Sequence, residues 1–379
     1  MVKVVPVNSS RELKKFTRFK NLLYKGHKYA IPTLESDELA TLNEKKNPAM
    51  EFCQRQCFLA YNEKGKIVGR ICAIINTKAN KTWNNTNGRF GFFDFIEDIE
   101  VAKALLEAAE AWVKERGMTG LVGPLGFTDM DEEGMLTEGY EELGTMATLY
   151  NYPYYPKFME ELGYRKDAGW VEMLLTMPRD TPPARIARFS SIVKEKNNLK
   201  VIKLKNTKEM IKQGWAHKIF NLINQEYAKL YGYTEMNDRQ IEHYVKMYMP
   251  IARLELICMI ADQEDNLVGF GISLPSLSHA LQKSKGRLFP FGWYYMLKAL
   301  KSKKAEYVDL MLIAVDKKYQ NKGLTAIIIN DITEGIISLG CEKAETNPEL
   351  EVNETMQNQW GVFKNRVHKR RCTFIKEEF

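Results

Sequence analysis

The 379-residue sequence lacks an apolar run long enough to cross a lipid bilayer. A membrane-spanning helix needs about 20 consecutive apolar residues, whereas an apolar run such as LMLIAV at residues 310–315 has only six. The first sixteen residues, MVKVVPVNSSRELKKF, also lack the apolar core of a secretory signal. We therefore expect a cytoplasmic protein with no membrane partner.

The sequence also lacks the cysteine and histidine spacings that hold zinc or form a disulfide framework. It has six cysteines, and the one close pair, Cys53 and Cys57, has no second pair to complete a zinc site. Its five histidines show no metal-ligand spacing. We expect reduced, partly buried thiols and no metal.

Neither sign of charge dominates the composition. The 55 Lys and Arg residues exceed the 48 Asp and Glu residues by seven, an excess that suits a phosphate-bearing ligand but is too diffuse to indicate nucleic-acid binding. The basic run at residues 368–371 is followed by Cys372 and Phe374 in alternation, which predicts an edge strand with a charged outer face. With 45% hydrophobic and 27% charged residues, each half can bury an ordinary core, and wholesale disorder is excluded.

Three features of the first half recur in the second half, which predicts two copies of one α/β unit. Each half opens with a short β-branched run, at residues 3–7 or 200–204, followed by a helix start. The sequences Ser9–Glu12 and Asn206–Glu209 have the spacing of a reciprocal cap, in which each side chain accepts a hydrogen bond from a backbone N–H group. A strand therefore leads into a helix at both places.

Each half continues with a hairpin pattern and then with a strand, an amphipathic helix and another strand. The hairpins are predicted at residues 58–69 and 259–269, with Gly or Asn in the turn. The helices are predicted within 101–117 and 324–340, each closing at its final glycine. Their predicted buried faces are Val101, Ala104, Leu105, Ala108, Trp112 and Val113 in the first half, and Leu324, Ile327, Ile328, Ile332, Ile336 and Leu339 in the second.

The two copies differ in length. The offset is 269 − 69 = 200 residues at the hairpins and 340 − 117 = 223 at the helix ends, so the second copy carries an insertion. We place it at residues 276–305 and interpret it as a loop and a helix beside the site. The Pro-rich stretch at residues 178–189 marks the boundary near residue 180, which predicts domains at 1–180 and 181–379.

One strand-to-helix junction, at residues 316–326, has the features of an anion site. The N–H groups and positive dipole end of a helix start attract anions. Gly323 would let a phosphate approach the backbone, and Lys317, Lys318 and Lys322 supply positive charge. The alternative is an ordinary lysine-rich surface turn that contains a glycine.

This junction resembles the pyrophosphate-binding motif of the GNAT acetyltransferase superfamily, which has Gln or Arg, two residues, Gly, one residue, and then Gly or Ala. Gln320 and Gly323 match the motif, whereas Thr325 stands where Gly or Ala is usual and would crowd the approach of the ligand. The order of elements over nearly the whole chain is similar to this superfamily. The stretch from residue 88 to residue 167 also resembles a family of two-domain GNAT-like proteins.

The resemblance implies that acetyl-CoA or another acyl-CoA binds the second half. Its pyrophosphate would lie on the amides of residues 318–325, and its pantetheine would run between strands at 310–315 and 343–347. The cofactor-binding residues implied are Leu312, Ile313, Ala314, Lys318, Gln320, Asn321, Lys322, Gly323, Leu324, Thr325 and Asn353. The equivalent junction of the first half, residues 95–100, has no glycine and three carboxylates. We therefore expect a degenerate first copy that binds no acyl-CoA.

Catalysis in this superfamily commonly needs a carboxylate that takes a proton from the amine and a Tyr that protonates the leaving thiolate. The Tyr position lies seven residues after an Asn, and here Asn353 is followed by Trp360, which cannot be a useful acid. Tyr233, Tyr294 and Tyr295 remain open as alternatives. Glu345 is the predicted base, with Asp309 as an alternative; either could instead be an ordinary solvated or capping carboxylate.

We predict an α/β protein with two tandem GNAT-like domains, each a central mixed sheet flanked by helices. The predicted activity is acyl-CoA-dependent N-acyl transfer, such as acetyl transfer, to an unidentified amine by a monomer or homodimer. One alternative is a regulatory CoA-binding protein without catalysis. Another is a tandem GNAT-like protein that takes an aminoacyl group from charged tRNA, which would need a broad basic groove.

Overall fold

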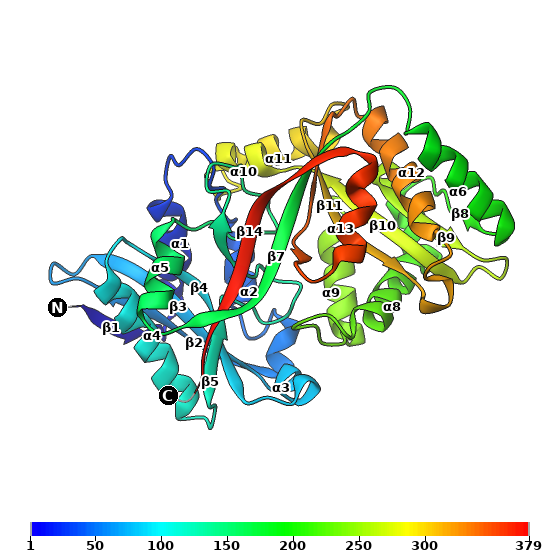
Figure 1. The fold of residues 1–379 in the computed structure, drawn as a ribbon. Coiled ribbons are helices and arrows are strands. Elements are labelled where there is room, and N and C mark those ends of the chain that lie inside the picture. Colours follow the sequence, from blue (N-terminus) through cyan, green and yellow to red (C-terminus); the bar gives the residue numbers. More distant parts are fainter. Residues whose placement is uncertain (1, 378–379) are drawn as a thin grey trace. The chain divides into compact units, whose positions relative to one another are not determined.

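The computed structural model describes residues 2–377, which form two compact units (Figure 1). The first unit comprises the chain up to Val171, Leu277–Leu297 and the residues from His368 onward, and the second comprises Glu172–Ser276 and Lys298–Val367. Three elements have residues in both units, namely β7 (Arg165–Thr176), α11 (Gly292–Lys301) and β14 (Lys364–Glu377).

The first unit contains a mixed sheet. Strands β1 to β4 are antiparallel neighbours, β4 and β5 are parallel, and β5 pairs antiparallel with β14. The strands are β1 (Lys3–Pro6), β2 (Cys53–Tyr61), β3 (Ile67–Asn76), β4 (Asn87–Phe95), β5 (Gly120–Gly123) and β6 (Met135–Glu138). The helices are α1 (Ser10–Leu23), α2 (Glu35–Thr41), α3 (Thr77–Trp83), α4 (Ile99–Lys114), α5 (Tyr154–Glu161) and α10 (Ser278–Ser284).

The second unit repeats this strand order. Strands β8 to β11 are antiparallel neighbours, β11 and β12 are parallel, and β12 pairs antiparallel with β7. The strands are β8 (Lys200–Val201), β9 (Ile257–Ala261), β10 (Leu267–Pro275), β11 (Val308–Val315), β12 (Lys343–Thr346) and β13 (Glu349–Leu350). The helices are α6 (Ala184–Lys196), α7 (Thr207–Lys212), α8 (Trp215–Tyr227), α9 (Asp238–Tyr248), α12 (Leu324–Ser338) and α13 (Glu354–Gln359).

The predicted repeat is confirmed by this topology. In each unit a hairpin precedes a strand–helix–strand unit, with β4, α4 and β5 in the first unit and β11, α12 and β12 in the second. The helix of this unit ends before a glycine with positive φ, Gly117 or Gly340. The predicted mixed α/β class is therefore correct.

The predicted helix caps and hairpin turns agree with the structure, with two differences. Ser9 and Glu12 form the reciprocal cap of α1. At α7 only half of the predicted cap forms, because the Asn206 side chain accepts from the Glu209 N–H while the Glu209 carboxylate accepts from Lys205 instead. In the β9–β10 turn the positive φ of 62° falls on Asp265, one residue before the expected Asn266.

Two predictions about longer segments were wrong. The insertion holds two helices, α10 and α11, and its part from Leu277 to Leu297 belongs to the first unit. The basic run near the C-terminus is no charged edge strand, because β14 pairs with both β5 and β6 and the side chains of Lys369 and Arg371 are buried.

Each unit has its own hydrophobic core beneath its central helix. In the first unit α4 buries Val101, Leu105 and Val113 against the sheet, and in the second α12 is buried over most of its surface. All six cysteines are buried and unbridged. None of the helices in the described part of the chain combines the length and the hydropathy needed to cross a membrane.

Candidate functional site

The β11–α12 junction of the second unit has an open helix start. After β11 a single turn of 3₁₀ helix (Lys317–Tyr319) leads to Gly323, which has a φ of 84° and directly precedes α12. This left-handed conformation favours glycine. No side chain caps α12, so the positive end of the helix is available to an anion.

The amides of this junction differ in whether they have a hydrogen-bond acceptor, and the Lys322 N–H donates to the Tyr319 carbonyl at 3.2 Å. Those of Lys318, Tyr319 and Gln320 already donate to Asp316, through its side-chain or backbone oxygens at 2.7–3.1 Å. Those of Gly323, Leu324 and Thr325 have no acceptor among residues 2–377. A bound phosphate would therefore meet the second group, a narrower set than the predicted 318–325.

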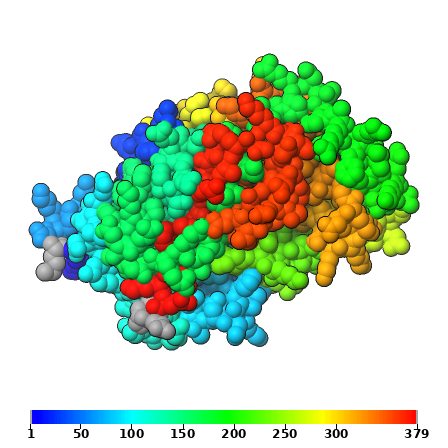
Figure 2. All heavy atoms as spheres, in the orientation of Figure 1, coloured from blue at the N-terminus to red at the C-terminus, as the bar shows by residue number. Residues whose placement is uncertain are grey.

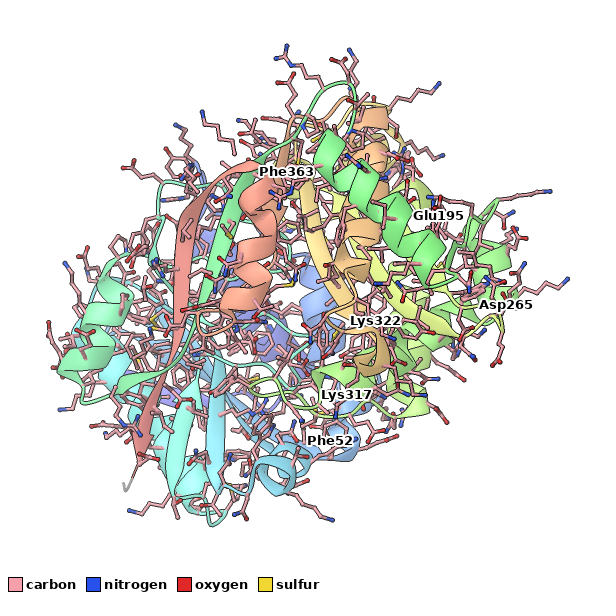
Figure 3. The ribbon with its side chains drawn as sticks, turned by 45° about the vertical axis from the view of Figure 1, so that its right-hand side comes forward. Phe52, Glu195, Asp265, Lys317, Lys322 and Phe363 are labelled. Atoms are coloured by element: carbon pink, nitrogen blue, oxygen red, sulfur yellow. The ribbon has the colours of Figure 1, made fainter. Side chains whose placement is uncertain are left out.

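Three exposed lysines precede these open amides in the same turn. Lys317 and Lys322, labelled in Figure 3, lie at the two ends of the turn, and Lys318 is exposed beside Lys317. The ammonium of Lys322 lies 4.7 Å from the centre of the Tyr319 ring. Their charges and the dipole of α12 favour the same kind of ligand, a polyanion.

The backbone of Gly323 is closely covered by α6. A Cβ atom added at this position would lie 2.8 Å from Cε1 of Phe189 and 3.0 Å from Cγ2 of Val193. Because Gly323 also has positive φ, a larger residue there would disturb the loop itself as well as any ligand.

Two residues at the C-terminal end of α8, Glu226 and Tyr227, form hydrogen bonds with the β11–α12 junction. The Glu226 carboxylate accepts from the Lys317 backbone N–H at 2.9 Å and from the Gln320 side chain at 2.7 Å. The neighbouring Tyr227 hydroxyl donates to the Ile313 carbonyl at 3.0 Å. Two residues that the sequence analysis assigned to the cofactor therefore have protein partners in this structure: Gln320 through its side-chain amide and Ile313 through its carbonyl.

Strands β11 and β12 part close to the junction. Their parallel pairing runs from Val308 to Leu310, and the Asn347 N–H donates to the Leu310 carbonyl at 2.9 Å as the last link. A bulge in the β10–β11 pairing lies just beyond, and Leu312 and Ile313 remain partly exposed. The end of β11 thus has one edge not paired with β12, next to the start of α12.

The equivalent junction of the first unit is closed. Asp98 caps α4 by accepting from the Glu100 N–H at 3.0 Å. Aromatic side chains of α5 take the backbone groups at the end of β4, because the Phe95 N–H donates to the Tyr155 hydroxyl at 2.8 Å and the Tyr154 hydroxyl donates to the Phe95 carbonyl at 2.7 Å. At this junction the helix start is therefore capped, and both backbone groups of Phe95 are bonded to tyrosine hydroxyls.

The predicted base, Glu345, is buried on β12. It lies beside Asp309 of β11 and opposite Leu174 of β7, and its carboxylate is within 4.8 Å of that of Glu172. All three carboxylates are buried. Burial excludes the ordinary solvated role that Glu345 could have had, and it places a group of acids on one face of this sheet.

Trp360, at the expected acid position, is buried in the core of the second unit, and its indole N–H donates to Glu349 Oε1 at 2.7 Å. Glu349 Oε2 is buried and has no hydrogen-bond partner in the described structure. Burial raises the pKa of Glu349 to about 7, although the Trp360 hydrogen bond favours the charged form. A carboxyl with a pKa near neutrality can take or give a proton.

Two other predicted residues, Asn353 and Tyr233, have structural partners. Asn353 caps α13, where its side chain accepts from the Met356 N–H. The buried Tyr233 hydroxyl donates to Asn224 Oδ1 at 2.6 Å, whereas Tyr294 is exposed on α11.

A comparison with solved structures identifies the fold. A tandem GNAT protein from the clavulanic acid biosynthesis pathway aligns with 100% of this chain and 98% of its own, with a TM-score of 0.57 and 10% sequence identity. The chain has the tandem GNAT fold. A fungal GCN5-related glucosamine N-acetyltransferase region also aligns, with a TM-score of 0.56 and 12% identity, over 99% of this chain and 38% of the multi-domain protein.

Two curated proteins are similar in sequence over most of their length. Protein YghO from Escherichia coli K12 is 26% identical over 97% of this chain and 94% of its own. A bacterial ceramide synthase from Caulobacter vibrioides is 25% identical over 93% of this chain and 91% of its own. No protein-family model matches the sequence.

Sequence reasoning did not single out Glu226 or Glu349. Glu226 precedes Lys317 by 91 residues, and no motif links the two. Glu349 lies eleven residues before Trp360, so that only the folded chain shows their hydrogen bond.

Proposed function

We propose that the second unit binds an acyl-CoA at the β11–α12 junction and that the protein transfers the acyl group to an amine. The observation that carries this proposal is the uncapped start of α12, where the amides of Gly323, Leu324 and Thr325 are open beside three exposed lysines. Amides at a helix start are suited to a pyrophosphate. The open edge of β11 beside it suits an extended amide-containing arm such as pantetheine.

The proposed reaction needs a proton acceptor and a proton donor. The amine nitrogen attacks the thioester carbonyl, the C–N bond forms, the C–S bond breaks, and the amine proton passes to a base while the CoA thiolate gains a proton. We assign the base to Glu345, following the superfamily pattern. We assign the acid to Glu349, because its pKa of about 7 leaves it partly protonated at neutral pH and Trp360 cannot serve.

The relative named a bacterial ceramide synthase bears on the substrates. A ceramide is a fatty amide of a long-chain amino alcohol, so a similar reaction here would use a long-chain acyl-CoA and a lipid amine. Acetyl-CoA with a small amine is the alternative that the GNAT acetyltransferase structures favour.

A binding and turnover panel tests the proposal. Acyl-CoA thioesters from acetyl to palmitoyl are titrated into the protein, and CoA release is then measured with small amines and with long-chain amino alcohols. Binding with release supports transfer. Binding without release from any amine supports a regulatory CoA-binding protein, for which Trp360 at the acid position is the favouring observation.

Variants separate the two carboxylates. Glu345→Gln should abolish release and leave binding intact. Glu349→Gln should lower release by about 10²–10⁴-fold if it supplies general acid catalysis. Unaltered turnover in either variant removes that residue from the mechanism.

A further inference from the structure

All of the net charge of the protein resides in one stretch of sequence. Residues 266–305 contain seven Lys or Arg residues and no Asp or Glu. Removing these seven from the 55 basic residues leaves 48, which balances the 48 acidic residues of the whole chain. The rest of the protein is therefore formally neutral, and this stretch carries the entire +7.

The same stretch exposes a cluster of aromatic side chains. Five large hydrophobic residues between 289 and 297 are exposed, and Phe289 and Phe291 have relative exposures of 79% and 69%. The others are Trp293, Tyr294 and Leu297. Exposed single apolar residues are ordinary in proteins, but five within nine residues form a patch.

The patch continues along one face of α11. Trp293, Tyr294 and Leu297 are exposed in its first half, and Lys298 and Lys301 are exposed on the same face further along. Lys283 and Lys285 precede the aromatic residues and are also exposed. None of these four lysines forms an ion pair within residues 2–377. We call residues 283–301 the basic aromatic segment.

The segment is firmly held at its base. Ser278 of α10 donates to the Gly144 carbonyl at 2.7 Å, and Gln282 donates to the Lys28 carbonyl at 2.9 Å. Locally, the Trp293 indole N–H donates to the Pro290 carbonyl at 3.0 Å. The yellow atoms of this part of the chain reach the molecular surface in Figure 2. The aromatic residues are thus presented by an ordered support.

We infer that the basic aromatic segment is a docking surface for an anionic lipid bilayer. Aromatic side chains settle at the boundary between headgroups and acyl chains, and lysines beside them are attracted to anionic headgroups. The cores of protein–protein interfaces are instead depleted in lysine. A symmetric dimer through this surface would place unpaired lysines of two copies against each other.

This inference concerns contact with a membrane surface, which needs no spanning helix, and it differs from the expectation of no membrane partner drawn from the sequence. It does not depend on the proposed acyl transfer, because vesicle binding is measured without acyl-CoA.

The test is co-sedimentation of the full-length protein with vesicles. Phosphatidylcholine vesicles with about 30% phosphatidylglycerol at about 0.1 M salt should bind the protein at least about tenfold more tightly than phosphatidylcholine vesicles alone. The variant Phe289→Ser/Phe291→Ser/Trp293→Ser should lose about tenfold or more of this binding. The variant Lys283→Gln/Lys285→Gln/Lys298→Gln/Lys301→Gln should lose a similar factor.

Control variants carry changes of the same kind outside the segment. Ile211→Ser/Met247→Ser replaces exposed apolar residues outside the segment, and Lys205→Gln/Lys208→Gln/Lys212→Gln removes exposed lysines of α7 and its approach. Both should bind vesicles like the wild type. All replaced residues are exposed, so circular dichroism should show an unchanged fold.

Four outcomes would overturn the inference. Wild-type protein could fail to bind the anionic vesicles, or the segment variants could bind as well as the controls. Single-stranded nucleic acid could displace the protein from vesicles, or light scattering could detect a dimer that the aromatic variant abolishes, and either of these two results would assign the segment to another partner.

Discussion

The indole N–H of Trp360 donates a 2.7 Å hydrogen bond to Oε1 of Glu349, so the residue at the expected acid position is linked to a buried carboxyl. Trp360 itself cannot exchange a proton near neutral pH. Glu349 can, because burial raises its pKa to about 7. The position that lacks a tyrosine therefore adjoins a group able to do related chemistry.

Glu349 should make the stability of the protein depend on pH. Its pKa is about 7 when folded and about 4.3 when unfolded, so between these values the folded state binds more protons and stability falls as pH rises. The free energy of unfolding of Glu349→Gln should lack this component, which is about 2–3 kcal/mol. Urea unfolding at pH 5 and pH 8 measures it. An equal pH dependence in wild type and variant would contradict the assigned pKa.

The elements that sequence reasoning predicted depend on short-range signals. The cap of α1, the two hairpins and the glycines after α4 and α12 each require residues within a few positions of one another. The buried face of α4 was only partly right, because Ala102, Leu106 and Ala109 are buried and the predicted Ala104, Ala108 and Trp112 are not fully so.

The parts that could not be predicted depend on contacts between distant segments. Tyr155 reaches Phe95 across 60 residues, and Lys369 is buried although lysine is almost always exposed. In the candidate site, a sequence motif predicted the open amides at the start of α12. No motif predicted the hydrogen bond from the Lys317 N–H to Glu226.

Arg70 is a buried cation whose loss should strongly destabilise the first unit. Its guanidinium donates to Asp94 at 2.7 Å, to Glu38 and to the Phe16 carbonyl at 3.0 Å. Arg70→Met leaves two buried carboxylates uncompensated, which should cost about 3–5 kcal/mol in chemical denaturation. The exposed Arg11→Met is the control and should change stability by less than about 0.5 kcal/mol. An equally small change in the free energy of unfolding for Arg70→Met would show that the contacts of Arg70 with Asp94 and Glu38 do not stabilise the fold.

Glu226 places a negative charge against the proposed pyrophosphate site. Glu226→Gln removes that charge and keeps an oxygen that can accept from Lys317. Acyl-CoA should bind about 2–10-fold more tightly to the variant, as expected when a like charge several ångströms away is removed. Competition binding measures the change. Weaker binding would instead mean that the carboxylate is needed to hold the loop in shape.

The closed junction of the first unit predicts one acyl-CoA per chain. Asp98 caps α4, and Tyr154 and Tyr155 take the backbone groups of Phe95. Equilibrium dialysis with labelled acyl-CoA should therefore saturate at one. Saturation at two would mean that the α5 aromatic residues can be displaced and that both copies bind.

The most direct test of the proposed cofactor site is calorimetric titration of acyl-CoA into Lys317→Gln/Lys318→Gln/Lys322→Gln. A change at Gly323 is less suited, because its positive φ and the nearby Phe189 would disturb the loop in any case. The control is Lys205→Gln/Lys208→Gln/Lys212→Gln, an equal loss of charge at exposed positions of the same unit. We predict that the loop variant binds about 10–100-fold more weakly than the wild type while the control binds normally. Equal affinity in all three proteins would contradict binding at the β11–α12 junction.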